Sequence, residues 1–436
     1  MKNILKIVVV TAIIFFLLII SVKFDLSKNY SFEIKDKNIH SKVLYKGLKN
    51  ATDFTADNNE NYFVAFNNKI QCINKNGFSY TIFKNNNYSI YSIEYYENKL
   101  YFSANNSIYC LDLKNKKVIS IMNNLPNFGD YKKVIIKIAN GYLYASIGSA
   151  TNSGVVGLDN KWINIFPFGH DITPKTITLR GEKFGDNNTG AFCPYGTKNY
   201  YGQIISEHFP GNSSIIIYNL KTGMAETFAY GIRNAVGMDF NSDGNIVAAV
   251  GGMEDRGLRP VKGDKDSIYI IDKNKWYGFP DYSGGMPILT FKGMYNRSIN
   301  NLLDKHPTTL VPQPIFRNNP AGSIGIIAVD CKGVLKDKDN IYYYDKKNND
   351  LCYIDNNRTT KVVLKVPVGQ NISSIKFIND KLAVLNDKDG YILEFSRNIE
   401  NSSEGFTRLD LYSFIIIIVI SIGTTITILM KGRGEK

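Results

Sequence analysis

The sequence of 436 residues is poor in the residue types that build metal and redox sites. It contains only four histidines, and none of its five cysteines belongs to a Cys-x-x-Cys pair. Zinc sites and thioredoxin-type dithiols use such pairs, so neither is predicted. The formal net charge is +13, yet no dense run of lysine and arginine is present. The positive charge is therefore interpreted as a general compositional bias, and a nucleic-acid partner is not predicted.

Helical periodicity is nearly absent between the two ends of the chain, whereas Tyr (28) and Phe (25) are abundant. Aromatic residues favour strands because they pack well on a pleated surface. Residues 61–74 and 99–113 each contain two short apolar segments around an Asn-Asn pair, which is a hairpin signal. Similar hairpins recur at intervals of about 40–60 residues, as in blade arrays. The pattern predicts an all-β chain, and alone it leaves a β-propeller, a pair of sandwiches or a β-helix open.

Two apolar runs lie at the ends of the sequence. Residues 7–22 follow Lys2 and Lys6, and residues 411–430 precede three further basic residues. A helix needs about 20 apolar residues to cross the hydrocarbon core. We therefore predict an N-terminal signal-anchor or transmembrane segment at 1–25 and a transmembrane helix at 411–430, with a cleaved signal peptide as the alternative for the first. The positive-inside rule then predicts a cell-membrane protein whose middle faces the extracytoplasmic side.

Three sequence blocks carry a resemblance to a known family. They are IGSATNSGVVGLDNK at 147–161, GIRNAVG at 231–237, and the segment 254–285, which contains RGLRP and WYGFPD. In this order and spacing they resemble the quinoprotein glucose/sorbosone dehydrogenase family. The resemblance implies a six-bladed β-propeller, expected here over residues 35–398. It also implies a site at one mouth of the central channel, with pyrroloquinoline quinone (PQQ) and calcium as cofactors and a sugar as substrate.

The resemblance assigns cofactor contacts to Arg233, Asn234, Arg256 and Arg259. Arginine suits that role because its planar guanidinium binds carboxylates through two hydrogen bonds, and the quinone carries three carboxylates. A structural salt bridge is the alternative interpretation of such arginines.

The loop at 251–266 is rich in oxygen ligands of the kind that calcium prefers, and Glu254 and Asp255 are the metal candidates. Basic residues alternate with these acids, so a solvated ion-pair loop is an equal alternative. The aromatic block WYGFP at 276–280 is predicted to pack in the core rather than to stack on a ligand.

The general base implied by the resemblance is a histidine, and none is present at its position. The matching stretch, 127–133, is NFGDYKK, which offers Asp130 or Tyr131 instead. Tyrosine, with a pKa near 10, is a poor base at neutral pH, and aspartate is a weak one.

Three functions therefore remain open from the sequence. The first is a PQQ-dependent sugar dehydrogenase that uses another base. The second is a propeller that binds a sugar or a wall carbohydrate without oxidising it. The third is a surface scaffold without a small ligand.

Overall fold

The computed structural model describes residues 33–36, 38–308 and 310–397 of the chain. The predicted membrane segments at 1–25 and 411–430 lie outside these residues. Within the described ranges, no helix has the length and apolar character needed to cross a membrane.

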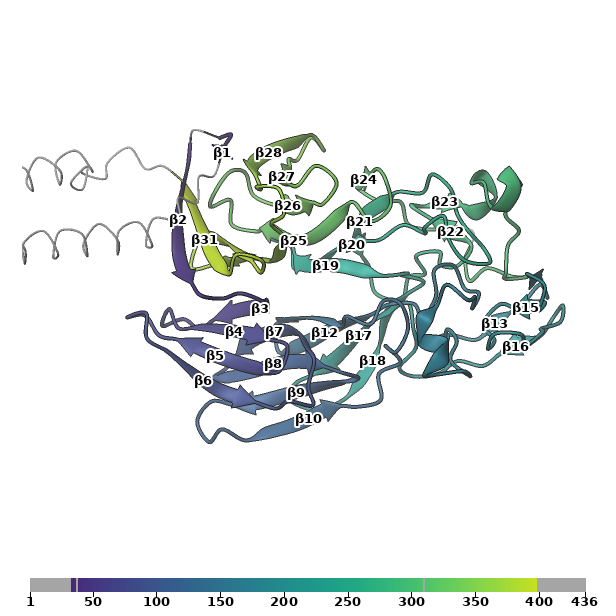
Figure 1. Cartoon of the computed structure of the whole chain (residues 1–436), viewed down its shortest axis with the longest axis horizontal. Coiled ribbons are helices and arrows are strands. Elements are labelled where there is room, and N and C mark those ends of the chain that lie inside the picture. The colour runs from purple at the N-terminus through teal and green to yellow at the C-terminus, as the bar shows by residue number, and fades with distance from the viewer. Residues whose placement is uncertain (1–32, 37, 309, 398–436) are drawn as a thin grey trace, which may run out of the picture. The chain divides into compact units, whose positions relative to one another are not determined.

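Six antiparallel sheets of four or five strands surround a central axis in this part of the chain (Figure 1). The first three sheets are β3 (Ala51–Ala56), β4 (Tyr62–Phe66), β5 (Lys69–Ile73) and β6 (Ser79–Lys84); β7 (Ile90–Tyr96), β8 (Lys99–Ala104), β9 (Ser107–Asp112) and β10 (Val118–Met122); and β11 (Ile135–Ala139), β12 (Tyr142–Ile147), β17 (Ser214–Asn219) and β18 (Ala225–Tyr230). The two hairpins expected around the Asn-Asn pairs are β4–β5 and β8–β9, so these predictions are confirmed.

The last three sheets complete the ring, and the sixth joins the two ends of the described chain. They are β19 (Ala235–Phe240), β20 (Ile246–Val250), β21 (Asp266–Ile271) and β24 (Phe316–Asn318); β25 (Ile324–Asp330), β26 (Asn340–Asp345), β27 (Asp350–Ile354), β28 (Thr360–Lys365) and β1 (Glu33–Ile34); and β29 (Ile372–Ile378), β30 (Lys381–Asn386), β31 (Tyr391–Arg397) and β2 (Ile39–Lys46). Because β2 pairs with β31, an early strand closes the last sheet. The chain is a six-bladed β-propeller, and the all-β propeller prediction is confirmed.

The apolar core lies between neighbouring blades rather than on the axis. One cluster joins Phe63 and Ile70 of the first blade to Ile93 and Phe102 of the second. Burying such a side chain contributes roughly 1.5–3 kcal/mol each. Face-to-face packing of the blades therefore holds the ring together and leaves the axis to polar side chains.

Five ionic side chains from five inner strands form what we call the ion girdle: Asp53, Glu94, Lys137, Asp239 and Lys376. The Lys376 ammonium lies 3.3 Å from Asp53 and 2.9 Å from Glu94, and the Lys137 ammonium lies 3.4 Å from Glu94 and 3.3 Å from Asp239. Burial lowers the pKa of Lys137, but the three acids raise it further, so its pKa lies above the usual value. The girdle links adjacent blades across the axis.

Two long insertions extend from the third and fourth blades. The first, at 148–213, holds η1 (Lys161–Asn164), β13 (Ile177–Thr178), β14 (Lys183–Phe184), β15 (Thr189–Gly190) and β16 (Ile204–Ile205). The second, at 272–315, holds β22 (Tyr282–Ser283), β23 (Met286–Pro287), η2 (Ile288–Thr290) and η3 (Met294–Asn296). Their apolar residues pack together, and Trp276 and Tyr277 are each 3% exposed. The prediction that the WYGFP block packs in the core is confirmed.

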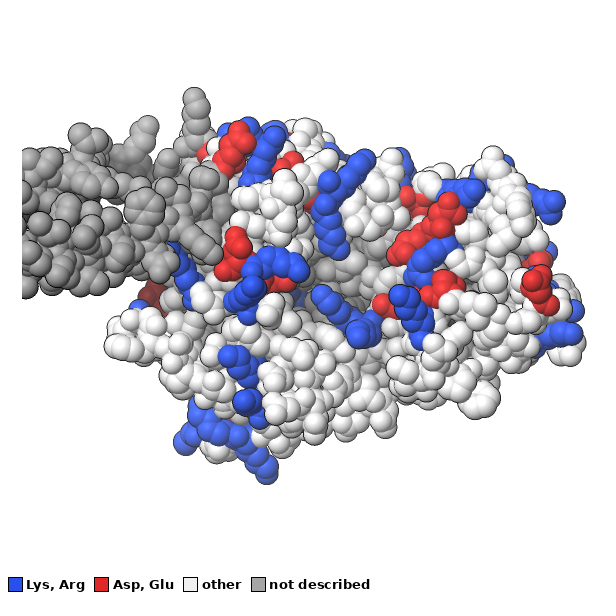
Figure 2. All heavy atoms as spheres, in the orientation of Figure 1, with Lys and Arg blue, Asp and Glu red and all other residues white. Residues whose placement is uncertain are grey.

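The insertions lie on the right of Figure 1, away from β2 and β31. The space-filling view of the same face is hollowed near the centre of the propeller, and lysine and arginine side chains gather around the hollow (Figure 2).

Candidate functional site at the channel mouth

The predicted site residues come from three loops on one face of the propeller. Asp130 and Tyr131 precede β11, and Arg233 and Asn234 precede β19. The loop 251–265, between β20 and β21, carries the remaining four. In a propeller, the segments that enter the inner strands and those that join the second and third strands meet on the same face. The structure therefore brings together residues that are more than a hundred positions apart.

Arg233 is 4% exposed, and its guanidinium group is almost fully engaged. Nε donates to the carbonyl of Asn152 at 2.8 Å, Nη1 to the carbonyl of Gly251 at 3.1 Å, and Nη2 to the side-chain oxygen of Asn152 at 2.8 Å. Nη2 also contacts the hydroxyl of Tyr131, and the guanidinium lies 4.2 Å from the centre of that ring. This arginine is held by the chain itself.

Arg256 binds three carboxylates at once. Its Nε lies 2.7 Å from Glu254, its Nη1 2.6 Å from Asp159, and its Nη2 2.7 Å from Asp130. Nη2 also donates to the Tyr131 hydroxyl at 3.0 Å. We call Asp130, Tyr131, Asp159, Arg233, Glu254 and Arg256 the guanidinium cluster. Its two cations face three carboxylates, so it offers no surplus of positive charge.

Both candidate bases are engaged in hydrogen bonds within the chain. Asp130 accepts hydrogen bonds from the Trp162 indole at 2.8 Å and the Asn160 amide at 2.8 Å, in addition to its ion pair with Arg256. Burial raises the pKa of Tyr131 to about 12, although the two arginines act in the opposite direction. At neutral pH the Tyr131 hydroxyl is therefore protonated.

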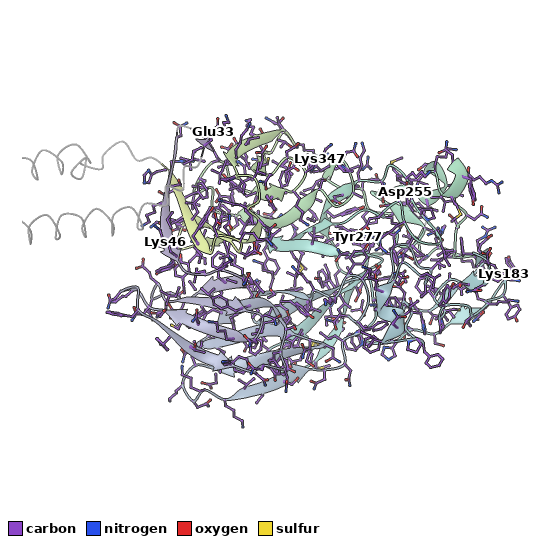
Figure 3. The ribbon with its side chains drawn as sticks, viewed as in Figure 1. Glu33, Lys46, Lys183, Asp255, Tyr277 and Lys347 are labelled. Carbon is purple, nitrogen blue, oxygen red and sulfur yellow. The ribbon has the colours of Figure 1, made fainter. Side chains whose placement is uncertain are left out.

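The other predicted residues lie apart from this cluster. Arg259 is 2% exposed and pairs with Asp281 at 3.0 Å, and three backbone carbonyls accept its remaining hydrogen bonds. Asn234 is half-buried beside Arg233, and its carbonyl accepts from Gly251 at 2.9 Å. Asp255 is exposed on its loop (Figure 3). Whether any of these residues binds a cofactor stays a prediction.

The sequence did not indicate Asp159 of the guanidinium cluster, nor Asn152 and Trp162, which form hydrogen bonds with Arg233 and Asp130. Asn152 and Asp159 lie in the 147–161 block, which was singled out without assigning roles to its members. Trp162 follows that block directly in η1. Asn152 and Asp159 could have been noticed because they are polar residues in a glycine-rich segment. Nothing in that segment, however, indicates that Asp159 pairs with Arg256.

An open groove lies beside the guanidinium cluster, with a volume of about 830 Å³. Its aromatic wall is formed by Phe128, Trp162 and Phe166, in which the Phe128 ring centre lies 5.5 Å from each of the other two. Polar side chains that line it are Asn105, Asn106, Asp130, Lys132, Asp159, Lys161 and Arg256. We call it the aromatic groove. Aromatic faces combined with amides and carboxylates suit a ligand that has both apolar faces and hydroxyl groups.

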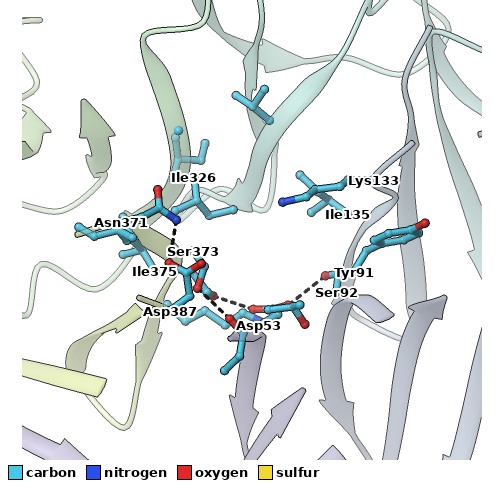
Figure 4. A pocket seen from close by; sticks show the side chains of 18 of the residues that line it. Asp53, Tyr91, Ser92, Lys133, Ile135, Ile326, Asn371, Ser373, Ile375 and Asp387 are labelled. Atoms are coloured by element: carbon cyan, nitrogen blue, oxygen red, sulfur yellow. Dashed lines mark hydrogen bonds and ion pairs between the residues drawn. The ribbon is translucent and has the colours of Figure 1, made fainter. Parts of the chain in front are cut away.

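A second hollow of about 410 Å³, the axial cavity, lies on the propeller axis (Figure 4). Four ion-girdle residues line it, with side chains only 9–14% exposed, and we call them its floor. The exposed Lys133 and Lys346 also line it, and we call them its rim. The Lys133 side chain points into the cavity in Figure 4. Tyr91 lines both the axial cavity and the aromatic groove, so the two hollows adjoin.

The fold and its mouth define a class: six-bladed propellers with a candidate ligand site on one face. No protein-family model matches the chain, and no curated protein sequence is detectably similar to it. The propeller is similar to the holo form of the PQQ domain of pyranose dehydrogenase from Coprinopsis cinerea, with a TM-score of 0.57 and 12% identity over 85% of this chain and 98% of that chain. It is equally similar to the calcium structure of a carbohydrate-active enzyme of family AA12 from Trichoderma reesei, with a TM-score of 0.57 and 14% identity over 85% and 100%.

The PQQ-bound aldose sugar dehydrogenase from Streptomyces coelicolor also matches, with a TM-score of 0.47 and 14% identity over 83% of this chain and 98% of that chain. The two likenesses with a TM-score of 0.57, at 12% and 14% identity, show a shared fold. They do not transfer a cofactor or an activity.

The predicted arginines are already engaged within the chain and are not arranged to bind a tricarboxylate quinone. Arg233 and Arg256 donate to internal oxygen atoms through all three guanidinium nitrogens, and Arg259 does so through its two terminal nitrogens. Within the described ranges, no group of three or more His, Cys, Asp or Glu side chains could hold a metal ion. Glu254 is turned toward Arg256 and Tyr131 instead. PQQ and calcium binding therefore stay predictions for this chain, and no reaction step is derived through either.

Proposed function

We propose that this chain is a carbohydrate-binding propeller that holds a saccharide in the aromatic groove and does not oxidise it. The observation that carries the proposal is the guanidinium cluster. Arg256, which the family resemblance assigns to a cofactor, is paired with Asp130, Asp159 and Glu254 of the same chain, and Arg233 is held by oxygens of Asn152 and Gly251. Asp130, one of two candidate bases, is part of that pairing.

The chemistry of the groove supports a saccharide as the ligand. Phe166 is 47% exposed and presents its ring to the groove, where a sugar ring can stack on it. The amides of Asn105 and Asn106 line the same groove and can exchange hydrogen bonds with hydroxyl groups. The fold likeness to a pyranose dehydrogenase domain favours the alternative of quinone-dependent sugar oxidation.

A membrane location outside the cytoplasm is part of the proposal and rests on the apolar runs at 7–22 and 411–430 with their basic flanks. Protease added to intact cells is expected to cleave the propeller. Protection until the membrane is opened would contradict this orientation.

Equilibrium binding and oxidation, measured on the same purified full-length chain, distinguish the two functions. We expect maltotetraose to bind, and Phe166→Ala to weaken binding roughly tenfold because one stacking contact of about 1–1.5 kcal/mol is lost. Phe168→Ala is the matched control, since Phe168 is 81% exposed and does not line the groove. Dye-coupled oxidation of aldoses with added PQQ and calcium is expected to be absent. Robust turnover would overturn the proposal in favour of the dehydrogenase.

A further inference from the structure

The rim of the axial cavity differs from its floor in how its charges are paired. The floor lysines, Lys137 and Lys376, each lie within 4 Å of two carboxylates. Among the described residues, neither Lys133 nor Lys346 has a carboxylate within that distance, although both line the same cavity. The rim therefore holds two ammonium groups that are available to a ligand.

The surroundings of these two lysines favour an anion. The Lys346 side chain reaches solvent, but partial removal of water by the surrounding protein lowers its pKa. The charge of Lys133 lowers this pKa further, whereas the charge of Asp266 raises it. Two cations that face one hollow repel each other, and an anion between them relieves that repulsion. Among the described residues that line the cavity, Asp387 is the one acid outside the ion girdle, and its carboxylate accepts a hydrogen bond from the Asn371 amide at 2.8 Å.

The cavity adjoins the aromatic groove rather than standing alone. Lys132 lines the groove and Lys133 lines the cavity, so the segment 127–133 forms the wall between them. Tyr91 borders both hollows on the other side. A chain-like ligand that lies in the groove can thus turn its end into the cavity.

We propose that the ligand is an acidic saccharide, whose terminal carboxylate or phosphate lies between Lys133 and Lys346 while the preceding sugar units cross Tyr91 into the aromatic groove. This inference rests on the proposed function and assigns the charge class of its ligand. The floor of the cavity is occupied by the paired ion girdle, so the anion is held at the rim and the saccharide does not pass along the axis.

The test compares three probes on the full-length chain: tetragalacturonate, neutral maltotetraose and inorganic phosphate. We expect tetragalacturonate to bind at least about tenfold more tightly than maltotetraose, because hydrogen bonds to charged groups are the stronger ones. The double variant Lys133→Gln, Lys346→Gln is expected to abolish this preference and leave maltotetraose binding unchanged. Lys347→Gln is the matched control, since Lys347 is exposed beside Lys346 but lines neither hollow.

Competition by phosphate identifies the terminal group. If phosphate displaces tetragalacturonate from the wild-type chain and fails to bind the double variant, the rim accepts phosphate as well as carboxylate, as the inference states. Equal binding of the acidic and neutral saccharides, or a preference that survives in the double variant, overturns the inference while leaving the proposed function intact. Failure of all saccharides to bind overturns both.

Discussion

Four lysines line the axial cavity, and they differ in burial, pairing and expected role. Lys137 and Lys376 at the floor are embedded among carboxylates of three other inner-strand positions, whereas Lys133 and Lys346 at the rim have none within ion-pair distance among the described residues. A buried charge without its partner destabilises the folded state, so removing one member of a floor ion pair should lower the free energy of unfolding substantially. A solvated charge without a partner costs little and can be kept for a ligand. Pairing, more than residue type, therefore separates structural from functional charges in this propeller.

The largest loss of stability should come from removing a lysine of the cavity floor. Lys376→Met leaves Asp53 without an ion-pair partner and removes one of two from Glu94, and the Lys376 side chain is only 9% exposed. We expect a loss of about 3–5 kcal/mol in the free energy of unfolding. Urea unfolding of the full-length chain measures it. A variant as stable as the wild type would show that the girdle contributes no net stability.

A slightly smaller loss of stability should come from a buried carboxylate that forms no ion pair with any of the described residues. Burial raises the pKa of Asp171 to about 6, although hydrogen bonds from Thr151 and the Ala150 amide oppose the shift. Because the folded pKa is raised, Asp171 contributes stability below pH 4 that is lost as the pH rises through 6. As the pH rises from about 4 to above 6, the free energy of unfolding of the wild type should fall by roughly 3 kcal/mol relative to that of Asp171→Asn.

Urea unfolding of both forms across this pH range checks the Asp171 prediction. Asparagine keeps the shape of the side chain and one acceptor oxygen for the Ala150 amide, its amide nitrogen can donate to the Thr151 hydroxyl, and it does not titrate. Parallel pH profiles for the two proteins would mean that Asp171 is not the titrating group.

Removing a cation from the guanidinium cluster should cause a loss of stability between those expected at the floor and at the rim of the axial cavity. Arg256→Met leaves three carboxylates facing one another, but the Arg256 side chain is 29% exposed, so solvent screens part of their repulsion. We expect a loss of about 1–2 kcal/mol. Arg256→Lys should recover only part of it, since an ammonium cannot match three carboxylates as a planar guanidinium does. Full recovery by lysine would show that the geometry of the cluster is unimportant.

The smallest effect on stability should come from the rim. Lys346→Met is expected to change the free energy of unfolding by less than about 0.5 kcal/mol, as surface substitutions usually do. The same variant should weaken binding of an acidic saccharide. A large loss of stability would show that Lys346 is a structural charge like the floor lysines, and the proposed difference between rim and floor would then be wrong.

The fold was predictable because its signals are local. The hairpins β4–β5 and β8–β9 follow from Asn-Asn turns between apolar segments, and Asn105 adopts a φ of 52° in the second of these turns, a conformation that asparagine tolerates. The proximity of Arg233 and Arg256 was expected from two of the family-like blocks, and Tyr131 was expected beside them because it lies where the resemblance implies a histidine.

The pairing of charges was not predictable, because it depends on contacts between distant positions. Asp53 and Lys376 are 323 residues apart, and nothing near either position indicates the other. Arg256 and Arg259 are three residues apart in one motif. One binds the acids at the mouth, whereas the other binds Asp281 of the second insertion. The family resemblance gave both arginines the same role.

The central claim, that the propeller binds a saccharide without oxidising it, is tested most directly by recovering the bound ligand. The full-length chain is saturated with tetragalacturonate in the presence of PQQ, calcium and an electron-accepting dye, and the reducing ends of the recovered saccharide are then quantified. The account predicts that the saccharide binds and that its reducing ends are recovered unchanged. Loss of reducing ends with matching reduction of the dye would contradict it, as would the absence of any bound saccharide.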